Sequence, residues 1–336
     1  MIARRTLLQL TSAALASAGL PSWAVAKGGD DRPLAALLLP VTGPTADLVR
    51  SLHHAADLAQ PSVAGKDGSR TTILAIDSGT TPESAADAAR TAIKRGAPLL
   101  IGPLYGAQVA ATVAAAGDVP VITLSNETQA AAGAFILGIT PAQAVGAILG
   151  YARSRGVRRV ALDGGGTGWD TAAGIAAAMI AHDLGLTITD NMPEAILVTG
   201  DADALTAAGR RLDGSGVQLL GTYQAMALSG AGLGAIDGAW LAAPDPDAFG
   251  EFSRRFETTF GNPPGVLAGL VYDAAAIART LRASGHLDRD GLTGSAGFTG
   301  TTGAVRFHRD GSATRELAIL VADNGSFRTV ARSQPA

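Results

Sequence analysis

The chain has 336 residues, of which 47% are hydrophobic and 16% are charged, so it can bury a sizeable core and is not a disordered protein. It contains no cysteine, which excludes disulfide bonds, a thiolate metal site, a cysteine nucleophile and a lipid-bearing cysteine. The formal net charge of −3 argues against nucleic acid as a partner.

Residues 1–26 have the pattern of an export signal. Arg4 and Arg5 precede a mostly apolar stretch over 7–20, and the small residues 24–26 form a cleavage site. Paired arginines occur both in twin-arginine signals and in ordinary secretory signals, so both export routes stay open. Cleavage after Ala26 leaves 24 basic and 29 acidic residues, a net charge of −5. We expect a periplasmic protein with no direct membrane anchor.

Short apolar runs then alternate with helical stretches. Strands are predicted at 34–40, 72–77, 98–102 and 119–124, with helices at 46–60, 82–95 and 107–116 between them. The runs are apolar on both faces, as expected for buried parallel strands. Each strand–helix–strand unit has the length of a parallel crossover, so these residues predict one parallel sheet covered by helices.

The same alternation restarts after Gly138. Helices are predicted at 141–155, 170–184, 202–213, 245–260 and 265–284, and strands at 158–162, 195–198, 217–221 and 238–243. The chain ends in strands at 303–308, 316–322 and 326–331, which we expect to be antiparallel and joined by hairpin turns.

This organisation predicts an α/β fold with two doubly wound, Rossmann-like lobes and a central cleft. We expect residues 32–139 plus 263–297 to form the first lobe, and 140–262 plus 298–333 to form the second. The lobes would hinge near Ile139, Asn262 and Phe298. Because ligands bind beyond the carboxyl ends of such strands, the loops that follow the strands are the candidate site.

The motifs of common catalytic and metal sites are absent. The five histidines form no HExxH pattern, and His53 and His54 are adjacent, so on a helix they point about 100° apart. No serine lies in a GxSxG elbow. The glycine-rich run 164–168 lacks P-loop and dinucleotide-binding spacing, which leaves an anion-binding loop or a flexible loop at the cleft mouth. We therefore predict no catalytic residue, no metal, no cofactor and no enzyme activity.

Four segments resemble type I periplasmic binding proteins of the branched-chain amino-acid-binding (Leu/Ile/Val-binding) family. They are LAALLLPVTGP at 34–44, APLLIGPLYGAQVAATVAAAGDVPVITLSN at 97–126, residues 160–174, and residues 240–276 with FGNPPGVLAGLVYDAAA. Within that family, the segments APDPDAFGEFSRRFETTFGNPP and GFTGTTGAVRFHRDGSATRELAIL are similar to penicillin-binding-protein activators. Their better-studied members are lipoproteins, whereas this chain lacks the lipid-bearing cysteine.

The resemblance implies a ligand site at the strand ends. The family's small hydroxyl residue in the turn after 98–102 is missing here, where the turn reads Tyr-Gly-Ala-Gln, so an ordinary branched-chain amino acid is not the expected ligand. A cleft ligand needs an apolar or stacking wall and a few polar anchors. The wall candidates are Tyr105, Trp169 and Tyr223, and the anchor candidates are Gln108, Ser125, Asn126, Thr167 and, as a loose match to the family's acidic residue, Asp237.

Two functions follow from these observations. The first is a solute-binding protein that closes around a small ligand and delivers it to an inner-membrane ABC permease. The second is a periplasmic regulator that contacts a peptidoglycan synthase, in the manner of the penicillin-binding-protein activators. A cleft with convergent polar groups favours the first, whereas a cleft plugged by side chains beside an exposed apolar patch favours the second.

Overall fold

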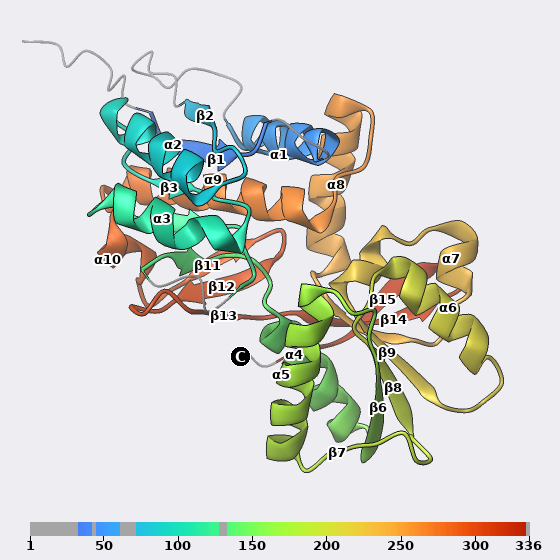
Figure 1. Ribbon diagram of the computed structural model, residues 1–336. Coiled ribbons are helices and arrows are strands. Elements are labelled where there is room, and N and C mark those ends of the chain that lie inside the picture. The colour runs from blue at the N-terminus through green and yellow to red at the C-terminus, as the bar shows by residue number, and fades with distance from the viewer. Residues whose placement is uncertain (1–32, 42–44, 61–71, 128–132, 334–336) are drawn as a thin grey trace, which may run out of the picture.

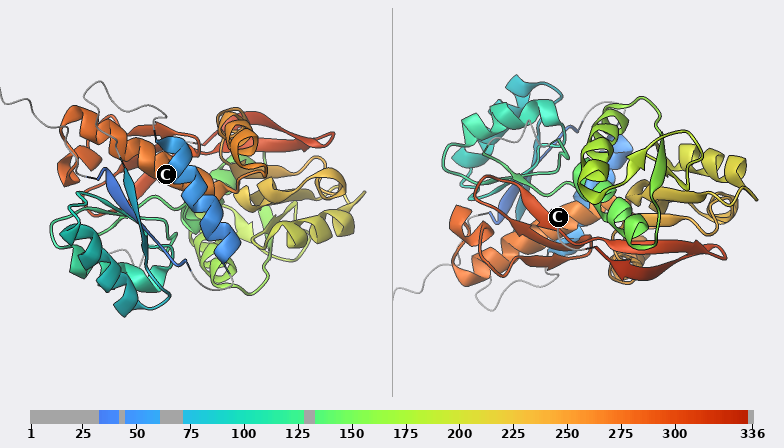
Figure 2. Two further views of the ribbon diagram at one scale, coloured as in Figure 1. Left: turned by 90° about the horizontal axis from the view of Figure 1, so that it is seen from above. Right: turned by 90° about the horizontal axis from the view of Figure 1, so that it is seen from below.

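The computed structural model describes residues 33–41, 45–60, 72–127 and 133–333 (Figure 1). The expected signal peptide lies outside the described residues. Two helix-covered sheets lie side by side and are joined by chain crossovers, as the views from above and below also show (Figure 2). The predicted α/β architecture of two doubly wound lobes is confirmed. Among the helices of the described part of the chain, none combines the length and apolar character needed to cross a membrane.

The first sheet has five parallel strands in the order β2-β1-β3-β4-β5. Their bounds are Ala35–Leu39 (β1), Ile73–Asp77 (β2), Leu100–Ile101 (β3), Val121–Thr123 (β4) and Phe135–Ile136 (β5). Successive residues of β1 point to opposite faces of the sheet: Leu37 belongs to the core with α1 and α9, and Leu38 to the core with α2 and α3. The helices are α1 (Ala46–Ala59), α2 (Pro82–Lys94), α3 (Gly106–Ala116) and α9 (Val266–Ser284).

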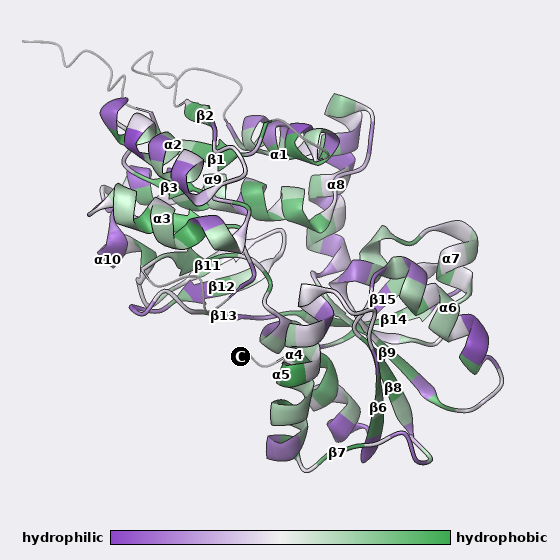
Figure 3. Cartoon of the chain, in the orientation of Figure 1, coloured by the Kyte–Doolittle hydropathy of each residue, from purple (hydrophilic) through white to green (hydrophobic). Residues whose placement is uncertain are grey.

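The second sheet has seven strands in the order β15-β14-β10-β9-β8-β6-β7. Their bounds are Arg159–Asp163 (β6), Thr187–Ile188 (β7), Ala195–Val198 (β8), Gln218–Thr222 (β9), Trp240–Ala243 (β10), Ala318–Asp323 (β14) and Ser326–Arg332 (β15). The first five are parallel, whereas β14 and β15 are antiparallel, as predicted for the chain end. Strands β6 and β8 are mainly hydrophobic, because helices cover both faces (Figure 3).

The second sheet's helices are α4 (Pro141–Ser154), α5 (Gly168–Leu184), α6 (Ala202–Leu212), α7 (Gly230–Gly234) and α8 (Pro246–Phe260), with a 3₁₀ turn, η1 (Tyr223–Ala227). Helices α4 and α5 begin at capping boxes: Thr140 and Thr167 each accept a hydrogen bond from the backbone N–H three residues later, whose side chain bonds back to the cap. These caps fix where each helix starts at the carboxyl edge of its sheet.

A small antiparallel sheet, β11-β12-β13, precedes β14 in the chain. It lies within residues 298–333, which were predicted to belong entirely to the second lobe. Its strands are Phe298–Gly300, Gly303–Phe307 and Ala313–Arg315, and the short helix α10 (Arg289–Leu292) precedes it. Phe307 packs edge-on against Phe135 of the first sheet with ring centroids 5.6 Å apart. The expected division assigned all of 298–333 to the second lobe, with a hinge near Phe298. In the structure, β11–β13 form a sheet of their own, and the chain joins the second sheet only at β14.

A buried polar network lies between the first and last crossovers. The Asp273 carboxylate on α9 accepts hydrogen bonds from the backbone N–H and hydroxyl groups of Thr301 and Thr302. Arg315 donates to the Thr302 hydroxyl at 3.0 Å, and to the Leu137 carbonyl at 2.6 Å. Because Leu137 and Arg315 each stand just before a crossover, the network ties both crossovers to α9.

A cleft between the two sheets

A cavity of about 300 Å³ opens between the two sheets. Its lining comes from both lobes and from the start of α9, and comprises Leu104, Leu124, Ser125, Asn126, Gly138, Ile139, Tyr223, Val266, Leu267 and Leu270. The loops that follow β4 and β9 contribute the polar groups Ser125, Asn126 and Tyr223, and the loop that follows β3 contributes Leu104. This is the edge at which ligands bind in doubly wound sheets, and the volume suits a small molecule.

The first crossover forms the floor of the cavity because Gly138 lets two backbone segments approach closely. A Cβ at Gly138 would lie 2.5 Å from the Ser125 carbonyl oxygen, a distance that real side chains do not reach. Thr123 holds the same loop: its hydroxyl accepts a hydrogen bond from the Ser125 N–H at 3.1 Å. The Ser125–Asn126 pair is therefore positioned against the crossover rather than on an unsupported loop.

Asn126 and Tyr223 line the cavity from opposite lobes. Asn126 follows β4 of the first sheet, and Tyr223 follows β9 of the second. Burial raises the pKa of the Tyr223 phenol to about 12, and the neighbouring Asn126 side chain opposes this shift only in part. The phenol is therefore neutral at physiological pH and can both donate and accept hydrogen bonds.

Trp169 packs behind the lining residue Tyr223 and is not itself among the residues that line the cavity. It lies in the first turn of α5, and its ring packs edge-on against Tyr223 at 5.5 Å between centroids and 81° between planes. Its indole Nε1 is buried without a hydrogen-bond partner among the described residues. An unpaired buried N–H costs about 1–3 kcal/mol, so this donor is suited to a ligand or water acceptor.

Tyr105 and Thr167 lie at the strand ends but not in the cavity lining. Tyr105 is the N-cap residue of α3, next to the lining residue Leu104, and its hydroxyl is 3.4 Å from the Thr45 hydroxyl. Thr167 is exposed, and its hydroxyl is engaged in the capping box with Asp170 at the start of α5.

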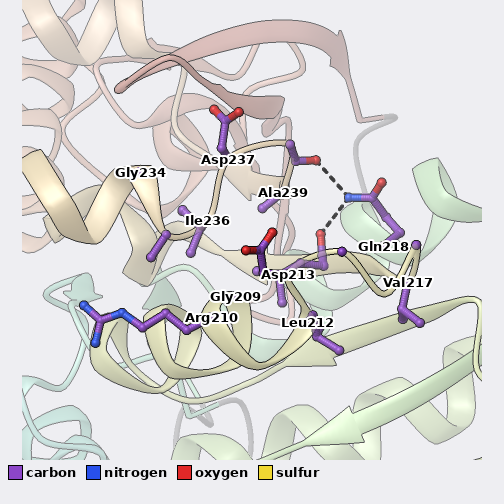
Figure 4. A pocket seen from close by; sticks show the side chains of 15 residues that line it. Gly209, Arg210, Leu212, Asp213, Val217, Gln218, Gly234, Ile236, Asp237 and Ala239 are labelled. Atoms are coloured by element: carbon purple, nitrogen blue, oxygen red, sulfur yellow. Dashed lines mark hydrogen bonds between the residues drawn. The ribbon is translucent and has the colours of Figure 1, made fainter.

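Gln108 and Asp237 point away from the cleft. Gln108 is fully buried, and its amide nitrogen donates to the carbonyls of Gly79 and Thr81 at 3.0 and 3.2 Å, which fastens α3 to the loop before α2. Asp237 precedes β10, so it lies at the amino end of that strand, beside a different pocket near Gln218 (Figure 4). It accepts a hydrogen bond from the Asn324 N–H.

Several cavity residues were not among the sequence-predicted ones. Leu104 and the α9 residues Val266, Leu267 and Leu270 supply most of the apolar lining. Leu104 belongs to the strand-end loop that the pattern identified. The sequence did not indicate the α9 residues as part of the site. Helix α9 follows the second crossover rather than a strand of either sheet, so no strand-end pattern identifies it.

The chain belongs to the periplasmic binding protein family, whose model matches residues 35–220, more than half of the sequence. The sequence-based resemblance to that family is thereby confirmed. No curated protein matches the chain significantly.

Solved structures share the fold over nearly the whole chain. A Rhodospirillum rubrum protein assigned to a branched-chain amino acid ABC transporter is 22% identical, with a TM-score of 0.76 and coverage of 88% of this chain and 99% of that one. A branched-chain amino acid ABC transporter periplasmic ligand-binding protein of Burkholderia xenovorans is 16% identical, with a TM-score of 0.72 and coverage of 90% and 95%. A Rhodopseudomonas palustris solute-binding protein in complex with 3,4-dihydroxybenzoic acid is 20% identical, with a TM-score of 0.68 and coverage of 90% and 97%. At these identities the structures show the fold alone.

Proposed function

We propose that the chain is an exported solute-binding protein that captures a small ligand between its lobes and delivers it to an inner-membrane ABC permease. The observation that carries this proposal is the interlobe cavity, where Ser125 and Asn126 from one lobe face Tyr223 from the other. The family and the ligand-binding relatives support the same role. No comparison supports the peptidoglycan-synthase regulator.

Binding and closure are linked because the ligand contacts both lobes at once only when they approach each other. A ligand shifts the open–closed equilibrium by its difference in affinity for the two states. The crossovers near Ile139, Asn262 and Leu317 are the proposed hinges, and we propose that β11–β13 move with the first lobe. The hydrogen bonds around Asp273 would hold two crossovers at a fixed position relative to α9 during this motion.

The cavity is suited to binding rather than catalysis. Its described lining consists of six apolar side chains, one glycine, one hydroxyl, one amide and one phenol. A hydrolase or transferase would need a nucleophile beside a base, and no acid or base lies among these lining residues.

A thermal-shift screen of residues 27–336 tests the proposal. The compounds are amino acids, amides, amines, aromatic acids and short peptides. A ligand that binds only the native state raises the melting temperature by mass action, worth about 2.7 kcal/mol at a hundredfold excess over Kd. We expect at least one compound to raise it and to require the cleft. If none does, and envelope pull-downs recover a peptidoglycan synthase, the proposal is wrong.

Trp169→Ala is the site-directed arm of this experiment. It removes the wall behind Tyr223 and should weaken ligand binding at least tenfold, because Tyr223 loses its supporting ring. Met179→Ala is the matched control, because Met179 lies on the same helix and is 66% exposed. Equal affinities for the two variants would remove Trp169 from the site.

A further inference from the structure

Glu127 carries an exposed carboxylate next to the residues that line the proposed ligand cleft, although it is not itself one of them. It directly follows the lining pair Ser125 and Asn126, and its side chain is exposed. Its backbone N–H donates to the Ser125 hydroxyl at 3.1 Å, which fixes the start of the side chain.

The Glu127 carboxylate lies against Gly106, the first residue of α3. A Cβ at position 106 would lie 2.7 Å from Oε1 of Glu127 and closer still to Oε2, so a side chain there would displace the Glu127 carboxylate from this position. The N-terminus of an α-helix carries a partial positive charge that favours an anion. The chain's own carboxylate therefore occupies the position beside α3 where the carboxylate of a ligand would otherwise be most favoured.

The remaining lining provides no charge that could compensate a second carboxylate. All ten described lining residues are uncharged, and the Tyr223 phenol is neutral. A ligand carboxylate would thus be repelled by the Glu127 carboxylate, with no positive charge among these lining residues to offset the repulsion. An ammonium group would meet an attractive charge at the same place.

One further feature of the second lobe suits a cation with an apolar body. The ring of Tyr223 lines the cavity with Trp169 packed behind it, and aromatic faces attract organic cations.

We propose that the cleft selects an apolar amine without a free carboxylate, and that Glu127 is the residue that sets this selectivity. The inference rests on the proposed solute-binding function and names its ligand class. It differs from the amino acid and aromatic acid complexes among the structural relatives, whose ligands all carry a carboxylate.

Matched ligand pairs test the proposal by calorimetry and thermal shift. Isopentylamine is compared with 4-methylpentanoate, and benzylamine with phenylacetate, so that each pair shares its apolar body. We expect the wild-type chain to bind the amine of at least one pair at least tenfold more tightly than the carboxylate. Glu127→Gln should reduce that preference at least tenfold, whereas Glu127→Asp should retain its direction.

Glu257→Gln is the control, because Glu257 is exposed near the far end of α8 and its removal changes net charge equally. It should leave the preference within twofold of wild type. Equal or tighter binding of the carboxylates by wild type overturns the proposal, as does an unchanged preference in folded Glu127→Gln. So does a wild-type chain that binds other compounds of the screen but neither amine. If no compound of any class binds, the solute-binding function itself is wrong, and this inference falls with it.

Discussion

Arg315→Met tests whether the buried network stabilises the junction between the lobes. Arg315 is 2% exposed, and its guanidinium donates to the Thr302 carbonyl and hydroxyl and to the Leu137 carbonyl. Burial lowers the pKa of Arg315 to about 10, and nearby Asp273 opposes the shift, so the side chain is charged at neutral pH. Methionine has a similar length but can neither donate to these acceptors nor balance the Asp273 charge.

The expected loss follows from what the substitution leaves behind. Removing one partner of a buried charged network typically costs about 3–5 kcal/mol, because the other charge stays buried without compensation. Urea unfolding followed by circular dichroism measures the loss, with each transition fitted separately if the lobes unfold in turn. The first-lobe transition should lose about this amount.

Arg328→Met is the matched control. Arg328 pairs with Asp323 at the surface and its side chain is 61% exposed, so its removal should cost no more than about 1 kcal/mol. If Arg315→Met costs no more than this control, the network does not hold the junction together and the reasoning is refuted.

Three further predictions concern single residues around the site. Gly138→Ala should weaken ligand binding at least tenfold in the thermal-shift assay, because the new Cβ displaces Ser125; unchanged affinity would show that the crossover does not position the loop. Burial alone would raise the pKa of Asp170, but hydrogen bonds from Thr167 lower it below its ordinary value. The ionised Asp170 carboxylate therefore stabilises the folded state above pH about 4, and this stabilisation is lost as the pH falls through the lowered native pKa. Asp170→Asn should therefore unfold more easily than wild type at pH 7, and this difference should narrow as the pH falls below about 4. A difference that does not change with pH would contradict this. Gln108→Leu should lose about 1–3 kcal/mol in urea unfolding with ligand affinity unchanged, whereas a selective loss of affinity would return Gln108 to the site.

The sequence predicted most of the fold because its strands are continuous apolar runs and its helices begin at recognisable caps. The strand predicted at 195–198 matches β8, and the helix predicted at 141–155 differs from α4 by one residue. Strands of two or three residues, such as β5 and β13, are too short to give a periodic pattern. The hairpin of β12 and β13 was expected in the second lobe, but it contacts the first sheet, where the Ile136 N–H donates to the Gly311 carbonyl at 2.9 Å.

The candidate site was predictable where a residue directly follows a parallel strand. Ser125, Asn126 and Tyr223 follow β4 and β9, and all three line the cavity. Asp237 precedes its strand and therefore lies at the opposite edge of the sheet. Gln108 is on the right loop, but the direction of its amide depends on carbonyl groups about thirty residues earlier in the chain, which no local pattern specifies.

Glu127 could not be predicted as a selectivity residue from the sequence. Its position depends on the space above Gly106, twenty-one residues earlier, and on the bond between its N–H and Ser125. The Tyr-Gly-Ala-Gln turn indicated only that the family's hydroxyl residue was missing. The structure shows that the Glu127 carboxylate lies beside the glycine of this turn.

The central claim is that a small ligand draws the two lobes together, and a distance measured across the cleft tests it most directly. The chain has no cysteine, so Ala110→Cys on α3 and Ala172→Cys on α5 introduce two unique labelling sites at exposed positions of opposite lobes. Pulsed electron resonance between spin labels at these sites should show a shorter and narrower distance distribution with saturating ligand, and Trp169→Ala should require a higher ligand concentration for the same change. An unchanged distribution with a ligand that demonstrably binds would contradict the account.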